Sequence, residues 1–397
     1  MRKFNIGPAF LVTAAFIGPG TVITATLAGA NYGYALVWAL LFSVIATIIL
    51  QGMTARLGII SQRGLAENIV ATMPNKYFKW AASGLILSAV VIGNGAYQGG
   101  NIAGASLGLE GLFGKLGTDV SLWPWVIGIV AFGLLITGSY RLIESALIAL
   151  VLVMSTAFVV TAVLVGVDIG QLWSGLTTWQ VPSGAMLTVI ALIGTTVVPY
   201  NLFLHTASVA KKWHNPDDIK LANRDLYFSI PIGGVLSIAI VSTAATAFFG
   251  HQINIQSAAD IAPALEPVFG SSAKWLLSTG LFCAGVSSAV TAPLAAAFAL
   301  TGLTGKAFDI SDKRFKLVWA TILIIGIIPA SLGFKPVSII VFAQIANGVM
   351  LPLIVLFLLW IMNSQLLGIY KNNRRQNILG GLVLLVSLML SAKSLFG

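Results

Sequence analysis

In this chain of 397 residues, 57% are hydrophobic and only 9% are charged, and the mean hydropathy is +0.95. A soluble domain of this length could not bury so much apolar surface, so the composition excludes a soluble globular protein. The net charge of +10 would suit a nucleic-acid partner, but the basic residues are placed as in a membrane protein and exclude that partner. One cysteine excludes a disulfide framework, and three histidines argue against a multi-histidine metal site.

Apolar segments long enough to cross a bilayer follow one another along the whole chain. Eleven spans are predicted, over residues 8–30, 33–60, 77–108, 122–138, 143–167, 186–210, 226–250, 272–304, 316–334, 337–362 and 376–396. The polar stretch 211–225 between the sixth and seventh spans is expected to be a solvated linker. The sequence therefore predicts an all-α integral membrane protein with a single transmembrane domain, 1–397.

The basic residues are distributed unequally between the two sides of these spans. With the N-terminus inside, the outer side holds only Lys115, Lys274, Lys335 and Lys393 of the 22 Lys and Arg residues. This asymmetry predicts a cytoplasmic N-terminus and contacts with membrane lipid. The short loops are typical of a bacterial inner (plasma) membrane protein.

Two spans are interrupted by proline in the middle. The first contains Gly18-Pro19-Gly20-Thr21 and the sixth contains Val198-Pro199-Tyr200-Asn201. Proline removes a backbone donor, and irregular backbone is tolerated in lipid only where it lines a cavity or is buried in protein. Five spans separate the breaks, which predicts an inverted five-plus-five repeat: repeat one at about 8–167, repeat two at about 186–362, and an extra helix at about 376–396.

Such paired breaks are typical of the binding site of a secondary transporter. The exposed helix ends offer N–H groups to an anion and carbonyl groups to a cation. The predicted substrate-binding residues lie at the breaks and on the tenth span: Gly18, Gly20, Thr21, Thr195, Val198, Tyr200, Asn201 and Gln344.

Further polar residues inside the spans could form a proton or polar pathway. These are Asn94, Tyr97, Asn101 and His205; the first three recur at helical spacing and share one face. Interhelical hydrogen bonding is an equally open interpretation for the amides, as is a structural role for His205. Ser287, Ser288 and Thr291 are expected to be packing residues.

The order of these motifs carries a family resemblance. Gly18-Pro19-Gly20-Thr21, Ala28-Gly29-Ala30-Asn31-Tyr32-Gly33-Tyr34, Pro199 to His205, Gly285-Val286-Ser287-Ser288 and Gln344 follow one another across nearly the whole chain. This series resembles the NRAMP (natural resistance-associated macrophage protein) family of divalent-metal transporters. The resemblance implies a leucine-transporter-type fold of eleven helices with broken helices 1 and 6, and symport by alternating access, typically of manganese or iron with protons.

The resemblance also places the family's metal ligands on particular positions of this chain. The family has Asp and Asn where this chain has Gly18 and Thr21, and a backbone carbonyl and a Met thioether where it has Thr195 and Val198. Tyr200 replaces a histidine, and Asn94 and Tyr97 replace two acids, whereas His205 and Gln344 are retained.

All twelve acidic residues fall in or next to predicted loops, so no carboxylate is expected at mid-membrane. Neutral oxygens suit a hard, partly hydrated cation better than manganese or iron. The sequence therefore predicts a metal-ion transporter of altered selectivity, coupled to a proton or a sodium ion. A carrier of a small organic solute, such as an amino acid or another zwitterion, is the alternative; a channel or a sensor is a third. No enzyme motif is present and no cofactor is expected.

Overall fold

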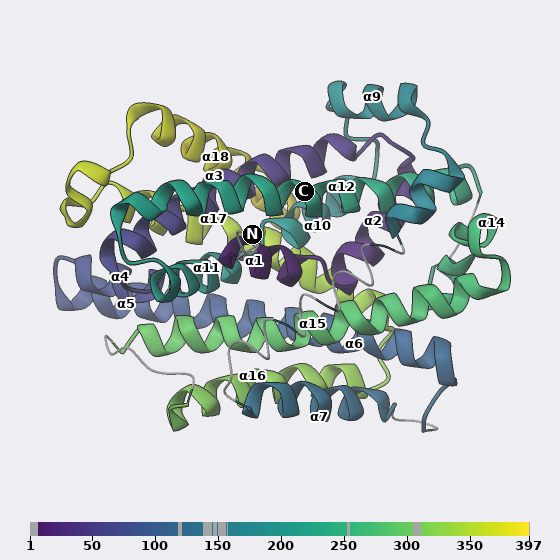
Figure 1. Cartoon of the computed structure of the whole chain (residues 1–397), viewed down its shortest axis with the longest axis horizontal. Helices are drawn as coiled ribbons and strands as arrows, with labels where there is room; N and C mark the ends of the chain where they lie inside the picture. The colour runs from purple at the N-terminus through teal and green to yellow at the C-terminus, as the bar shows by residue number, and fades with distance from the viewer. Residues whose placement is uncertain are drawn as a thin grey trace, which may run out of the picture.

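The computed structural model describes residues 7–117, 121–137, 145, 149, 156, 158–251, 255–304 and 311–396. Within these residues the regular structure is entirely helical (Figure 1). The helices of the first half are α1 (Pro8–Phe16), α2 (Pro19–Tyr32), α3 (Val37–Ser61), α4 (Leu65–Thr72), α5 (Lys76–Ser88), α6 (Asn94–Phe113), α7 (Trp123–Ile136), Phe158–Val165 and α9 (Ile169–Thr177). Those of the second half are α10 (Met186–Thr196), α11 (Pro199–Lys212), α12 (Ile219–Phe248), α13 (Ala258–Ile261), α14 (Glu266–Phe269), α15 (Ala273–Gly302), α16 (Lys313–Ser331), α17 (Pro336–Met362) and α18 (Arg374–Phe396).

Both predicted helix breaks are confirmed. The first span is divided into α1 and α2 at Ile17 and Gly18, and the sixth into α10 and α11 at Val197 and Val198. Each second half-helix begins with a proline, whose fixed φ suits a first helical position and whose missing N–H is no loss there.

Eight helices among the described residues are long and apolar enough to span a membrane, or up to nine if Phe158–Val165 and Ile169–Thr177, bent by 115°, form one span. The divided first span and the 14-residue α7 fall outside this length criterion. In the predicted span 143–167, nearly all residues before 158 lie outside the described residues. A count of eleven therefore stays a prediction, whereas the all-helical membrane architecture is confirmed.

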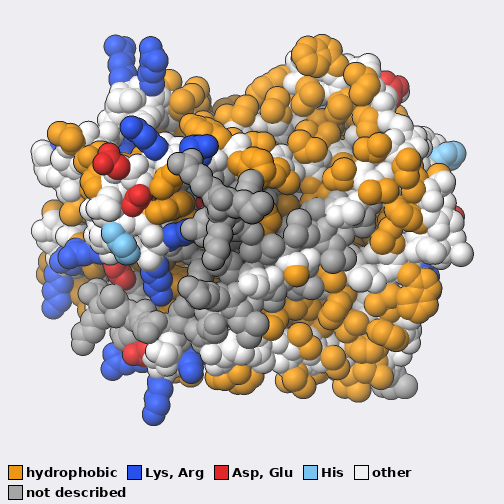
Figure 2. Space-filling model, in the orientation of Figure 1, with side chains coloured by type: hydrophobic (Ala, Val, Ile, Leu, Met, Phe, Trp, Pro, Cys, Tyr) orange, Lys and Arg blue, Asp and Glu red, His pale blue; other side chains and the backbone are white. Residues whose placement is uncertain are grey.

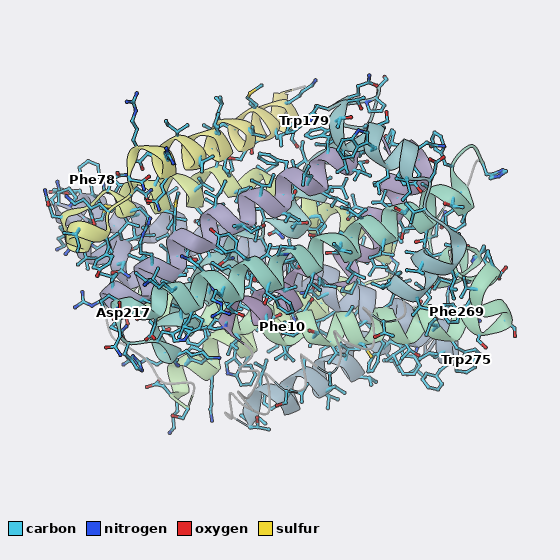
Figure 3. All side chains as sticks on the ribbon, turned by 45° about the horizontal axis from the view of Figure 1, so that its top comes forward. Phe10, Phe78, Trp179, Asp217, Phe269 and Trp275 are labelled. Carbon is cyan, nitrogen blue, oxygen red and sulfur yellow. The ribbon has the colours of Figure 1, made fainter. Side chains whose placement is uncertain are left out.

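The long helices run side by side between two ends of the bundle (Figures 1 and 3). Phe78 and Asp217 lie at one end, and Phe269 and Trp275 lie at the other (Figure 3). In Figure 2, Lys and Arg side chains gather at the left end of the visible face, while hydrophobic side chains cover most of the rest of its described surface. The pattern is that of a protein with one strongly basic membrane face.

Helix α6 lies among α15, α16 and α17, and small residues allow this close packing. A Cβ atom at Gly285 of α15 would lie 2.6 Å from the backbone nitrogen of Ala105 in α6. A Cβ atom at Gly104 would overlap Pro19, at the start of α2. The first break is therefore packed directly against α6.

The stretch 211–225, predicted to be a solvated amphipathic linker, is exposed or half-buried at nearly every residue, and much of it is helical. Helix α11 continues to Lys212, and α12 begins at Ile219. Asp225 is part-buried rather than solvated, because its Oδ2 accepts a hydrogen bond of 2.8 Å from the backbone N–H of Ala9. This carboxylate satisfies a first-turn donor of α1 and carries the charge that a helix N-terminus favours.

Candidate substrate site

At the first break, two carbonyl groups of α1 have lost their helical donors. Pro19 has no N–H to give to Ala15, and hydroxyl groups take its place: Ala15 O accepts from Tyr97 Oη at 3.3 Å and from Ser288 Oγ at 3.2 Å. Phe16 O accepts a short hydrogen bond from Thr21 Oγ1. Hydroxyl groups of three helices therefore cap the carbonyl end of α1.

At the second break, the capping is sparser. Val197 N donates to Ile193 O at 2.8 Å, and Asn201 N donates to Val198 O at 3.1 Å. The carbonyl of Thr196 lies 3.5 Å from the Thr47 hydroxyl of α3, which is the long limit of a hydrogen bond.

The two breaks touch each other through their threonines. Thr21 Oγ1 lies 2.8 Å from Thr195 Oγ1, and both side chains are fully buried. Because the proton of Thr21 is donated to Phe16 O, Thr195 is the donor of this pair. The lone pairs of Thr195 Oγ1 are then not used by this hydrogen bond.

Side chains of α15 and α17 occupy the space that the glycines leave open. A Cβ atom at Gly18 would lie 2.5 Å from Ser288 Oγ and 3.7 Å from Asn101 Oδ1. A Cβ atom at Gly20 would overlap the side-chain amide of Gln344. The predicted site residues Gly18, Gly20 and Gln344 are thus brought together.

The predicted polar face of α6 packs against α15. Asn94 Nδ2 donates to Ala292 O at 3.1 Å, and Gln98 Nε2 donates to Ala289 O at 3.0 Å. The side-chain nitrogens of Asn94 and Gln98 therefore make hydrogen bonds between helices, which supports the interpretation of this polar face as interhelical hydrogen bonding. Tyr97 turns instead toward the breaks, with its ring edge-on to Tyr200 at 5.1 Å between centroids.

His205 lies apart from this group, against α3. Its Nδ1 is 2.9 Å from Thr54 Oγ1, and Thr54 also donates to Gln51. The Nε2 atom is buried without a partner among the described residues. One ring nitrogen of His205 therefore contacts a hydroxyl group, and the other has no hydrogen-bond partner among the described residues.

Several buried polar atoms on α6, α11, α15 and α17 have no hydrogen-bond partner among the described residues. They belong to Gln98, Asn101, Tyr200, Asn201, Ser287, Gln344 and Asn347. Buried polar groups are normally paired, so such a concentration indicates where a ligand or ordered water would bind. Beside this group, a small cavity of about 10 Å³, measured as room for the centre of a water molecule, is lined in part by Asn94, Tyr200 and Asn347. This volume has room for about one water molecule.

The site is electrically neutral. The fully buried polar side chains among the described residues are hydroxyls, amides and His205 alone. Within the same residues, no group of three or more His, Cys, Asp or Glu side chains could hold a metal ion. Val198 is buried at the second break and offers no donor atom from its side chain.

The sequence interpretation missed the roles of three residues that bind the broken first and sixth spans. Ser288 was assigned to packing, although it caps Ala15 O. Asp225 was assigned to a solvated linker, and Thr47 was not singled out. Only tertiary structure reveals these roles, because each partner lies more than 145 residues away in the chain. The one available signal was the polarity of Ser288 and Thr47 inside apolar spans.

Comparison with known proteins identifies the family to which this chain is similar. The family model "Nramp: Natural resistance-associated macrophage protein-like" matches residues 9–397. The "Divalent metal cation transporter MntH" of Acidiphilium cryptum is 28% identical over 365 residues, covering 89% of this chain and 81% of the relative. The protein of the same name from Yersinia pestis is 27% identical over 407 residues, covering 99% and 95%.

Solved structures show the same fold. The Eremococcus coleocola manganese transporter, in complex with an aromatic bis-isothiourea compound, superimposes with a TM-score of 0.82 at 20% identity, covering 98% of this chain and 85% of that one. Mhp1, a nucleobase-cation-symport-1 family transporter, gives a TM-score of 0.64 at 16% identity, covering 98% and 93%. With the family model matching nearly every residue, the chain belongs to the Nramp family.

Proposed function

We propose that this chain is a secondary transporter that carries metal cations by alternating access, with the substrate held between the breaks at residues 17–18 and 197–198. The names of its metal-transporting relatives and its membership of the family support this proposal. The contact between Thr21 and Thr195 supports the location, since it joins the two half-helix ends directly. We infer that a substrate bound between the breaks separates these two hydroxyl groups.

The proposed selectivity differs from that for manganese or iron. The observation that carries this proposal is the neutral set of buried oxygens at the breaks, which includes Thr21, Thr195 and Asn201 but no carboxylate. Transition metals favour softer or charged ligands, whereas Mg²⁺ gives up its water reluctantly and is held through that water. A hydrated hard cation such as Mg²⁺ therefore fits best.

A second candidate, a carrier of a small organic solute, is favoured by one specific observation. Hydroxyl groups already satisfy the carbonyl end of α1, whereas the first-turn N–H groups of α2 at Gly20 and Thr21 have no partner within their helix. Such an end attracts an anionic group, for example the carboxylate of an amino acid.

Uptake by proteoliposomes tests the first candidate against the second. We expect saturable Mg²⁺ uptake that exceeds Mn²⁺ uptake, with and without an imposed pH gradient. Saturable amino-acid uptake without any metal uptake would overturn the metal proposal. As a sharper step, Gly18→Asp should be combined with Ser288→Gly, because Ser288 occupies the space that the new side chain needs. This double variant should tighten Mn²⁺ binding if cations are the substrate, and it should abolish uptake of an anionic solute.

We further propose that the N-terminus is cytoplasmic and that the membrane is a bacterial inner membrane. The basic end of the bundle in Figure 2 supports this orientation. Asn94, Tyr97, Asn101 and His205 are proposed to form a proton or polar pathway, and their burial within α6 and α11 is consistent with that role. A cysteine-accessibility assay on intact cells, with single cysteines at the two ends of α18, checks the orientation.

A further inference from the structure

A groove lies between α16 and α17 on the side of the bundle. Both helices pack closely against α6 but much less against each other. Two small residues of α6, Gly95 and Ala96, form the floor of the groove. Its volume is about 600 Å³, measured as room for the centre of a water molecule, whereas the cavity beside the breaks has about 10 Å³. A space of this size has room for part of a larger molecule.

The walls of the groove are apolar. Ile325 and Pro329 of α16 form one wall. Ile339 and Phe342 of α17 form the other. Phe342 is 65% exposed, and Phe334, in the loop that joins the two helices, is 60% exposed. Exposed apolar surface of this kind, in a chain that spans a membrane, indicates a face that contacts lipid.

The groove follows the first two turns of α17. Phe342 lies seven residues after Lys335, a distance of about 10 Å along a helix. The hydrocarbon layer of one leaflet is about 15 Å thick, which is half of the bilayer core. With its mouth at the membrane surface, the groove therefore extends through most of one leaflet. Its length suits an acyl chain that lies parallel to the helices.

The mouth of the groove carries a positive charge. Among the described residues that line the groove, only Lys335 is charged, and Ser338 follows it by one helical turn. No acidic residue follows Asp312 in the sequence, so neither α16 nor α17 carries a carboxylate. The one acid of α6, Glu110, lies near the other end of that helix and accepts a hydrogen bond from Ser121. The mouth therefore suits an anionic group.

The floor of the groove belongs to a helical turn that also reaches the substrate site. Gly95 and Ala96 line the groove, whereas their neighbours Asn94 and Tyr97 donate hydrogen bonds to the backbone of α15 and α1. Tyr97 bonds to the carbonyl end of α1 at the first break. A molecule in the groove would thus contact the same turn of α6 from the opposite side.

We propose that this groove binds one anionic phospholipid of the surrounding membrane. Its phosphate group lies at Lys335, and one acyl chain lies between α16 and α17. The bound chain supports the turn of α6 at Gly95 and Ala96, and so helps to hold Asn94 and Tyr97 in place. Binding of the lipid does not depend on which substrate the protein carries.

Native mass spectrometry of the full chain in detergent tests the charge of the site. The probes are phosphatidylglycerol and phosphatidylcholine with identical acyl chains. One phosphatidylglycerol molecule should bind about fivefold more tightly than phosphatidylcholine, the factor expected for one lysine near an anionic headgroup. Lys335→Gln should abolish this preference. Lys274→Gln is the matched control: this lysine is also exposed, in the first turn of α15, but it does not line the groove, and its variant should keep the preference.

A second pair of variants tests the place of the acyl chain. Ala96→Phe should lower the affinity for both lipids, because the new ring occupies the floor of the groove. Ser338→Trp narrows the mouth from an exposed position and should have the same effect, so it decides the matter if Ala96→Phe does not fold.

Three results would overturn the proposal. These are equal affinities for the two lipids, equal losses in Lys335→Gln and Lys274→Gln, and unchanged lipid binding in a folded variant with a filled groove. A dimer that binds no lipid and dissociates in Ser338→Trp would also overturn it and assign the groove to a second copy of the chain. Failure of metal uptake would leave the lipid site standing, because the binding measurement requires no transport.

Discussion

The two breaks share a proline at the start of the second half-helix but have different surroundings. At the first break, the groups that would meet an added side chain are themselves side chains: Ser288 at Gly18, and the amide of Gln344 at Gly20. At the second, Gly194 packs against backbone, namely the carbonyl oxygen of Gln344 and the nitrogen of Gly348. Side chains can move or be exchanged, whereas backbone cannot. Exchangeable side chains therefore lie against the glycines of the first break, whereas backbone lies against Gly194 in the last turn of α10, just before the second break.

The strongest test of this contrast is Gly194→Ala. Its Cβ would overlap the Gln344 carbonyl and lie 2.7 Å from the Gly348 nitrogen, so α10 and α17 would have to separate. Overpacking of this kind costs about 1–3 kcal/mol. We expect a lowered melting temperature in detergent and loss of uptake. Gly52→Ala is the control: nothing lies within 4 Å of its Cβ position in α3, so this variant should be at least as stable as the unaltered protein.

At the first break, Gly18→Ala should lower the stability less than Gly194→Ala does, and a second substitution should restore part of the loss. The obstacle is the hydroxyl of Ser288, at 2.5 Å from the new Cβ. Combining Gly18→Ala with Ser288→Ala should recover part of the lost stability, and a double-mutant cycle should give a coupling energy of about 0.5–3 kcal/mol. Additive effects of the two substitutions would show that the residues do not compete for space.

The N-terminus of α1 offers a prediction about the anchoring of the first break. Asp225→Ala removes the acceptor of the Ala9 N–H and should lower the free energy of unfolding by about 1 kcal/mol, the usual value of such a cap. Asp225→Asn keeps an acceptor oxygen and should retain much of that stability. Equal losses in both variants would mean that charge, rather than the hydrogen bond, holds α1 to α12. Chemical denaturation monitored by tryptophan fluorescence measures both.

The smallest expected effect is on the bridge between the breaks. Thr21→Val and Thr195→Val each remove one hydroxyl of the 2.8 Å pair. Their coupling energy in thermal stability should be about 0.5–1.5 kcal/mol, as for a single net hydrogen bond. A value near zero would show that the two half-helix ends do not depend on each other in the empty protein.

The sequence was sufficient to predict the breaks because proline and glycine act locally. The effect of Pro19 and Pro199 on the backbone depends on their immediate neighbours in the chain. Each begins its half-helix, and both breaks occur as predicted. Residues that act through distant partners could not be predicted in the same way. The role of Ser288 depends on Ala15, 273 residues away, and that of Asp225 on Ala9, 216 residues away. The same limit applies to the linker, because nothing local distinguishes a solvated Asp225 from one that caps another helix.

Uptake by a variant of both breaks tests the central claim most directly. The double variant Thr21→Val/Thr195→Val should be compared with the unaltered protein and with Gly52→Ala in proteoliposomes that are supplied with Mg²⁺ and Mn²⁺. If the substrate passes between the breaks, the double variant should lose saturable uptake while it remains folded, and Gly52→Ala should retain it. Unchanged saturable uptake by the folded double variant would place the substrate elsewhere and contradict this account.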